Sequence, residues 1–288
     1  MAQGARNRFR RLGLGLLAGA GAMAVASLTT PGLAAADTAD TTAPLPFPPP
    51  SYLGGPPGDP YACMAADVFG CAIVFGGSGI PIPPQDYIDA VNERYIQPEH
   101  PGFTPQALFT PEGLQPFTGV KQLTLNESMA QGLILVDAAL KQQLAAGHQV
   151  DLYGYSQSAT IDTLEERNLL ALPADQRPSP EQLSFTLLGD PNNPNGGMLQ
   201  IFDLPALQDA AGNGPTIPSL GVTFDGATPD SIYPTTITTL EYDGFADFPR
   251  YPIDLLADLN AVAGIQYVHD QYPELTQAQL DSAITLPT

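Results

Sequence analysis

Residues 150–160 hold the side chain best suited to nucleophilic chemistry. A short apolar strand runs there into the Gly-Tyr-Ser-Gln-Ser sequence of residues 154–158, and a helix is expected to follow at once. This order is typical of a nucleophile elbow, a sharp strand-to-helix turn that exposes a serine hydroxyl above a sheet. The turn needs small residues on both sides of Ser156; Gly154 fits, and Ser158 stands where glycine is more usual. The helix N-terminus would direct its free amides at an anion formed there, so the pattern predicts Ser156 as a nucleophile.

A serine hydroxyl needs a base to remove its proton, and imidazole is the usual one. The chain has three histidines. His100 precedes the serine in a proline-rich stretch, and His148 lies at an expected helix–strand junction. His269 comes late in the chain, and it alone satisfies the order serine, acid, histidine that α/β-hydrolases follow. The sequence therefore predicts His269 as the base, against the alternative of an ordinary surface-loop histidine.

The acid that orients His269 should lie in a loop that follows a late strand. Asp247 is preferred because it lies three residues beyond Gly244, which would let the strand turn. Asp243 competes for the role, although it would still lie in the strand. Asp190 follows the strand after the elbow, where its side chain could instead form a turn with the two residues after it. We expect Asp247, with Asp190 and Asp243 as alternatives.

An oxyanion hole requires two donors that point at the oxygen of a tetrahedral intermediate. One would be the backbone N–H of Gln157, the residue after the nucleophile. The second should come from the loop after an early strand, where residues 76–79 read Gly-Gly-Ser-Gly and Ser78 offers an amide and a hydroxyl. A glycine-rich loop can also cradle phosphate, but this one lacks the lysine of GxxxxGK[ST] and does not match GxGxxG. No signal for a cofactor is present.

The first 36 residues have the composition of a secretory signal peptide. Arginines begin the segment, residues 12–28 are apolar, and Ala34 and Ala36 offer small residues at a cleavage site. We expect cleavage after Ala36 and a secreted or cell-envelope location; the alternative is a retained membrane anchor, for which the run is short. Residues 37–60 form a proline-rich tether.

The two cysteines, Cys63 and Cys71, lie close together in the chain. An even number of cysteines in an exported protein indicates one disulfide, and two buried thiols are the alternative. Because no histidine or third cysteine is nearby, a metal site such as a zinc centre is not expected.

The chain is strongly acidic, with a formal net charge of −20. Loss of the leader would remove four arginines and no acid, leaving 6 basic and 30 acidic residues. Such a surface repels nucleic-acid phosphates and anionic lipid headgroups, so neither is an expected electrostatic partner.

Residues 61–288 are predicted to form one α/β domain with a mostly parallel sheet flanked by helices. Residues 192–234 are rich in Gly, Pro and Asn, and a connection of this length predicts a lid-like or substrate-binding insertion. The strands are expected at 71–75, 149–153, 183–188 and 235–242, and the helices at 84–96, 125–146, 157–170 and 251–263.

Several separated motifs between residues 74 and 272 resemble the PE-PPE domain, known mainly from mycobacterial cell-envelope proteins. They lie, in order, at residues 75–81, 153–158, 188–197, 242–252 and 267–269. The resemblance implies a cutinase-like α/β-hydrolase fold with a Ser-Asp-His triad and a GxSxG or GxSxS elbow, in which Ser158 is ordinary. It carries over Ser156 as nucleophile, His269 as base, Asp247 as acid and Ser78 as an oxyanion residue.

The function that follows is an exported serine esterase or lipase acting on acyl esters or envelope lipids. The resemblance also implies an alternative, an acyltransferase that moves fatty acyl groups between trehalose-type glycolipids, because both reactions need the same triad. A non-catalytic envelope protein on a hydrolase scaffold is the third hypothesis. No protein partner is inferred, and the PE or PPE helical module of multidomain members is not expected here.

Overall fold

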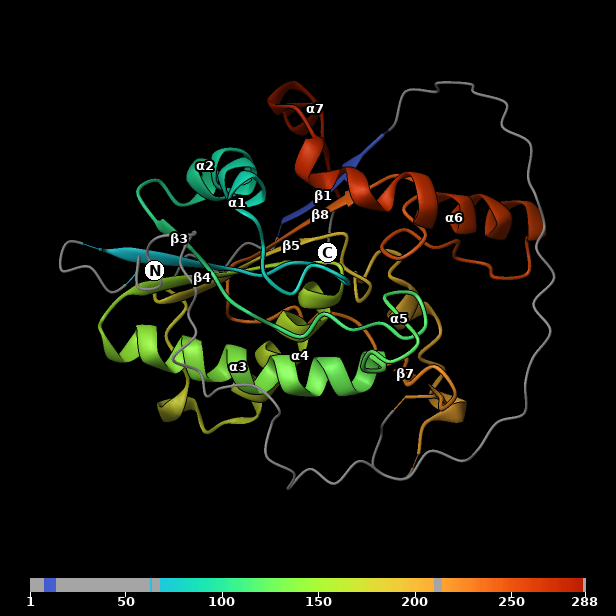
Figure 1. Ribbon diagram of the computed structural model, residues 1–288, viewed down its shortest axis with the longest axis horizontal. Helices are drawn as coiled ribbons and strands as arrows, with labels where there is room; N and C mark the ends of the chain where they lie inside the picture. The colour runs from blue at the N-terminus through green and yellow to red at the C-terminus, as the bar shows by residue number, and fades with distance from the viewer. Residues whose placement is uncertain (1–7, 14–62, 64–67, 210–213, 287–288) are drawn as a thin grey trace.

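The computed structural model describes residues 8–13, 63, 68–209 and 214–286, which form a sheet between two groups of helices (Figure 1). Within these residues the main sheet has seven strands in the order β3-β2-β4-β5-β8-β1-β9, and a separate hairpin pairs β6 with β7. All neighbouring strands of the main sheet are parallel except β1 and β9. The predicted α/β fold with a mostly parallel sheet is confirmed. The strands are β1 Arg8–Leu12, β2 Gly70–Val74, β3 Thr104–Ala107, β4 Gln149–Tyr155, β5 Leu183–Leu188, β6 Thr216–Ile217, β7 Val222–Thr223, β8 Thr235–Leu240 and β9 Ile284–Leu286.

The helices cover both faces of the sheet. In Figure 1, α3 and α4 lie below it, and α1, α2, α6 and α7 lie above it. The α-helices are α1 Gln85–Val91, α2 Gln97–Glu99, α3 Leu125–Ala145, α4 Gln157–Ala171, α5 Met198–Ile201, α6 Leu255–Tyr267 and α7 Gln277–Asp281; a π-helical turn spans Asn92–Ile96, and 3-10 turns span Ala174–Gln176, Pro205–Leu207 and His269–Glu274.

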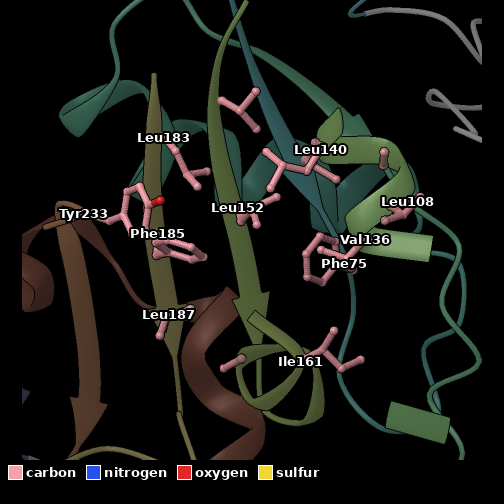
Figure 2. Close-up of a cluster of buried hydrophobic side chains, with 14 of the residues drawn as sticks. Phe75, Leu108, Val136, Leu140, Leu152, Ile161, Leu183, Phe185, Leu187 and Tyr233 are labelled. Atoms are coloured by element: carbon pink, nitrogen blue, oxygen red, sulfur yellow. The ribbon is translucent and has the colours of Figure 1, made fainter. Parts of the chain in front are cut away.

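The central strands are mostly apolar, as expected where helices cover both faces of a sheet. Every residue of β2 and of β5 is buried, and β4 is buried from Val150 onward. Figure 2 shows the core between the sheet and helices α3 and α4, where Leu152 of β4 lies near Leu140 of α3 and Phe185 of β5 lies beside Tyr233. Burying one such side chain stabilises the fold by about 1.5–3 kcal/mol. This packing fixes the ends of the strands, where the loops of the site begin.

Strand β1 joins the sheet at a place that the sequence analysis did not anticipate. We expected the domain to begin near residue 61, but Arg8–Leu12 lies between β8 and β9, with Phe9 and Leu12 buried. Phe9 and Leu12 lie on opposite faces of the strand and join the core clusters on the two sides of the sheet, and Arg10 pairs with Glu99. The rest of the predicted leader and the tether at 37–60 lie outside the described residues. Among the described helices, none is long and apolar enough to cross a membrane.

Cys63 and Cys71 form a disulfide with a Cα–Cα distance of 5.5 Å, and both are fully buried. The bond ties the segment before the sheet to β2. Over the residues that the structure describes, no group of three or more His, Cys, Asp or Glu side chains is arranged to hold a metal ion.

Candidate active site

Four loops meet at the carboxyl edge of the sheet, where parallel strands end together. They follow β2, β4, β5 and β8, and they carry Ser78, Ser156, Asp190 and Asp243 respectively. The sequence therefore places its chemically useful side chains at one edge, as the alternation of strands and helices requires.

Ser156 occupies the sharp turn between β4 and α4. Its backbone has φ 59° and ψ −118°, a conformation that non-glycine residues rarely adopt and that costs of order 1–3 kcal/mol. Gly154 is required here, because a Cβ at this position would lie 2.7 Å from the backbone of Ala159 on α4. Ser158 is accommodated because its hydroxyl accepts a hydrogen bond from the Tyr155 amide at 2.7 Å. The elbow predicted from the sequence is the turn that the chain makes.

Ser156, His269 and Asp243 form a continuous hydrogen-bonded chain. The Ser156 Oγ lies 2.7 Å from His269 Nε2, and His269 Nδ1 lies 2.9 and 2.8 Å from the two carboxylate oxygens of Asp243. A carboxylate only accepts hydrogen bonds, so the neutral imidazole carries its proton on Nδ1 and leaves Nε2 to accept the Ser156 hydroxyl. Ser156 is 8% exposed, His269 5% and Asp243 0%, so exposure is greatest at the serine and falls along this hydrogen-bonded series.

The Asp243 carboxylate is held from its other side by two further donors. Phe245 N–H donates to Oδ1 at 2.9 Å, and the Tyr272 hydroxyl donates to Oδ2 at 2.6 Å. Tyr272 is itself fixed, because its oxygen accepts from the Leu240 amide at 3.0 Å. Burial, together with the charge of Asp243, raises the pKa of Tyr272 well above its ordinary value, so its phenol stays protonated and donating. Sequence reasoning missed Tyr272, which lies three residues after His269.

Aromatic rings enclose the imidazole of His269. The Tyr155 ring stacks on it with centroids 5.3 Å apart, and the Phe245 ring meets it edge-on at 4.7 Å. The Tyr155 hydroxyl also donates to the His269 carbonyl at 2.8 Å. These contacts restrict the imidazole to the orientation that reaches both Ser156 and Asp243.

The preference for Asp247 as the acid beside His269 is wrong in this structure. Its carboxylate accepts instead from Arg11 Nη2 at 2.8 Å and from the Tyr242 amide at 3.0 Å, and it lines a cavity of about 410 Å³ with Arg11. The cause is the position of the turn, which we assigned to Gly244. The strand ends at Leu240 and Tyr242 makes the turn, with φ 70°, so Asp243 is already in the loop.

Asp190 does not reach the histidine either. Its buried carboxylate accepts from the Asn192 amide at 2.8 Å and from the Thr228 hydroxyl at 2.7 Å. It thereby ties the end of β5 to the far end of the 192–234 segment. Burial raises the pKa of Asp190 to about 6, although these hydrogen bonds oppose the shift. Asp190 therefore forms a turn with the two residues after it, which was the alternative considered for this residue in the sequence.

The loop after β2 lies against the nucleophile. A Cβ at Gly77 would be 3.1 Å from the Ser156 Cβ, closer than an ordinary contact, so glycine favours this close approach of the loop. Ser78 follows, and its hydroxyl donates to the side chain of Gln157 at 2.9 Å. The loop is fixed farther along, because Gly79 N–H donates to the Glu112 carbonyl at 2.8 Å. Ser78 is therefore tied to the residue that follows Ser156.

The other two histidines have different surroundings. His148 Nδ1 lies 2.7 Å from the Gln143 side chain, and His100 lies 3.3 Å from the buried carboxylate of Asp151. Burial lowers the pKa of His100, but the Asp151 charge and hydrogen bond outweigh it and raise the pKa overall. Neither histidine contacts Ser156.

Two described parts of the predicted lid-like segment, 192–234, contact other elements of the fold. Phe202 contacts the Phe248 ring at 5.2 Å beside the acid loop, and Thr223 bonds to Asn126 at the start of α3. Next to this segment, α6 leads directly into His269 and exposes one apolar face. The exposed residues of that face are Leu255, Leu256, Leu259 and Val262.

Comparison with known proteins finds one matching family model and several similar mycobacterial proteins. The PE-PPE domain matches residues 101–288. Esterase PE16 of Mycobacterium tuberculosis is 50% identical over 216 residues, which are 75% of this chain and 39% of that protein. Diacyltrehalose acyltransferase Chp2 of the same organism is 28% identical over 231 residues, covering 76% of this chain and 60% of Chp2. The chain thus spans less than two thirds of the length of both relatives.

Among solved structures, an acetylxylan esterase aligns with a TM-score of 0.42 and 15% identity. The alignment covers 75% of this chain and 99% of that structure.

Proposed function

Because this chain belongs to the PE-PPE domain family, we propose that it is a serine hydrolase that cleaves carboxylic esters through an acyl-enzyme. The observation that carries the proposal is the unbroken hydrogen-bonded chain from Ser156 through His269 to Asp243. The name of the relative PE16 as an esterase supports the same reaction.

The geometry supports a specific division of roles. Ser156 Oγ attacks the ester carbonyl while His269 Nε2 takes its proton, and the Asp243 carboxylate stabilises the imidazolium that forms. The Gln157 amide and Ser78 stabilise the oxyanion. His269 then returns the proton to the leaving alcohol, whose departure leaves an acyl group on Ser156. Water attacks this ester, again with His269 as base, and releases the acid.

The test is turnover of p-nitrophenyl esters, C2 to C16, by the full chain beside Ser156→Ala. We expect hydrolysis by the wild type and a loss of at least 10³-fold in the variant, because the nucleophile is gone. Ser179→Ala, at a partly exposed position, is the matched control and should retain full activity. Equal turnover by wild type and Ser156→Ala would contradict the proposal.

A second candidate reaction delivers the acyl group to a sugar hydroxyl instead of water. It is favoured by the similarity to Chp2, whose name describes acyl transfer to a trehalose lipid. The acyl-enzyme is the same, and only the acceptor differs. Addition of trehalose to the ester assay, followed by mass spectrometry, separates the two: an acylated sugar supports transfer, and free acid alone supports hydrolysis.

Export belongs to the same proposal and rests on the leader-like composition of residues 1–36. Strand β1 lies inside this segment, so cleavage after Ala36 would remove a strand that the sheet contains. N-terminal sequencing of the protein from a secreting culture decides between them. A start at Asp37 supports cleavage, whereas retention of residues 8–12 supports a lasting role for β1 in the sheet.

A further inference from the structure

The side chain of Gln157 connects the oxyanion loop to helix α3. Gln157 follows the nucleophile, and its side chain is directed inward, leaving the residue 2% exposed. Its Oε1 lies 2.9 Å from Ser78 Oγ, and its Nε2 lies 2.6 Å from Ser128 Oγ on α3. Ser128 is fully buried and also accepts the Gly113 amide at 2.8 Å. The carboxamide is therefore held at both ends by hydroxyl groups.

The protons in this network can be arranged in two ways. The two arrangements differ only by exchange of Oε1 and Nε2 of Gln157, and all other heavy atoms stay in place. In the first, Ser78 donates to Gln157 Oε1, so its one hydroxyl proton cannot reach an oxyanion. Ser128 then receives two N–H groups, and its own proton takes no part in these bonds.

Rotation of the carboxamide by 180° gives the second arrangement. Ser128 then accepts from Gly113 and donates to Gln157 Oε1, while Gln157 Nε2 donates to Ser78 Oγ. The two ends of a glutamine amide are distinguished by such networks and not by shape. In this arrangement the Ser128 proton has an acceptor, and the Ser78 hydroxyl proton is free to point at the substrate oxygen.

We propose that the Gln157 side chain, anchored by Ser128, is a positioning group that fixes Ser78 by its lone pair and so aims the Ser78 hydroxyl at the oxyanion. The inference rests on the proposed function. It assigns two roles to one residue, because the Gln157 backbone amide contacts the oxyanion while its side chain acts only through Ser78. Preorganised donors of this kind matter because they need no reorientation during the reaction.

A double-mutant cycle tests this coupling. Ser78→Ala, Gln157→Leu and the double variant are compared with wild type for kcat and KM on one p-nitrophenyl ester. We expect Ser78→Ala to lower kcat by roughly 10²–10³-fold, and Gln157→Leu by roughly 10-fold or more, with KM little changed. In the double variant, kcat should equal that of Ser78→Ala within about 2-fold, because Gln157 then has no hydroxyl to position.

Ser128→Ala provides a second measurement that alters no residue of the elbow. It should lower kcat by roughly 3–10-fold, as expected for one neutral hydrogen bond, and this loss should also vanish in the Ser78→Ala background. Ile134→Ala, at an exposed position of α3, is the control and should leave kcat unchanged.

The outcomes separate the two levels of the proposal. Absence of turnover in wild type, or turnover that survives Ser156→Ala, overturns the proposed function together with the inference. Turnover that depends on Ser156, with losses that multiply in the double variant or with no loss in Gln157→Leu, overturns the positioning role alone.

Discussion

At the scale of single residues, the site depends on which carboxylate reaches the imidazole. Asp243 binds Nδ1 of His269 with both oxygens and is itself held by Phe245 and Tyr272. Asp247, four residues later, forms an ion pair with Arg11. The two acids share a loop but have different partners, so their substitution should have different consequences.

Replacement of Asp243 by asparagine should lower kcat by about 10²–10⁴-fold with little change in KM. The amide can present its NH₂ to Nδ1, which favours the wrong tautomer and no longer stabilises the imidazolium. Asp247→Asn is the matched control and should change kcat by less than about 3-fold. The measurement is steady-state kinetics on one p-nitrophenyl ester, and a larger loss in Asp247→Asn would contradict the assignment.

The sequence singled out Ser156 and His269, which the structure brings within hydrogen-bond distance, but it named Asp243 only as an alternative to Asp247 for the residue beside the imidazole. Ser156 lies in a motif whose small neighbours are required by a local turn, and only one histidine follows it late in the chain. Which of Asp243 and Asp247 reaches the imidazole depends on where the chain turns after the strand. The turn is made by a positive φ at Tyr242, which a tyrosine in the sequence does not indicate. Tyr272 and Ser128 reach Asp243 and Gln157 from distant parts of the chain. These contacts depend on tertiary packing, so no local sequence pattern indicates them.

At the scale of elements, α6 positions His269 together with the loop that carries Asp243. The helix crosses the loop so closely that a Cβ at Gly264 would lie 1.6 Å from the Tyr242 carbonyl, and one at Gly244 would lie 2.0 Å from the Ala261 carbonyl. From the sequence we expected Gly244 to make a turn, but the structure shows that a glycine is needed there because α6 approaches the loop closely. His269 follows two residues after α6 ends, so the helix fixes its distance from Asp243.

Gly264→Ala should therefore lower both stability and kcat. In an ordinary helix this change is stabilising by about 1 kcal/mol, so a loss would report the close contact. The control is Gln266→Ala, at an exposed position of the same helix, which should be neutral. Thermal unfolding and ester turnover of the two variants check this; a more stable Gly264→Ala with full activity would show that α6 does not press on the acid loop.

At the scale of the whole molecule, buried carboxyl groups make stability depend on pH. Burial raises the pKa of Glu112 to about 8, of Glu165 and Glu166 to about 7, and of Asp190 to about 6, from ordinary values of 4.5 for Glu and 3.8 for Asp. Between the ordinary and the raised values the folded state binds more protons than the unfolded state. The free energy of unfolding must then fall as pH rises, and this loss ends once pH exceeds the folded-state values.

We expect these groups to stabilise the protein most below about pH 4, and this stability to be lost progressively up to about pH 8. Glu112→Gln should make the decline less steep, by up to about 1.4 kcal/mol per pH unit, because it removes one of the protons released. Urea unfolding of both proteins at pH 5, 6.5 and 8 measures the slopes. Parallel slopes would mean that Glu112 is ionised in the folded state throughout this range.

The overall arrangement was the most predictable part of the molecule. Apolar strands that alternate with helices specify a mostly parallel sheet, and such a sheet gathers its functional loops at one edge. The position of β1 was not predictable, because five residues with two buried apolar side chains, Phe9 and Leu12, give too short a pattern to distinguish a strand from the start of a leader.

The most direct test of the account is covalent labelling with a p-nitrophenyl alkylphosphonate, followed by peptide mass spectrometry. The full chain should gain one phosphonyl group on Ser156, at a rate that falls at least 10²-fold in His269→Ala and in Asp243→Asn but not in Asp247→Asn. Labelling elsewhere, or at an equal rate in all four proteins, would contradict the claim that Ser156, His269 and Asp243 act as one unit.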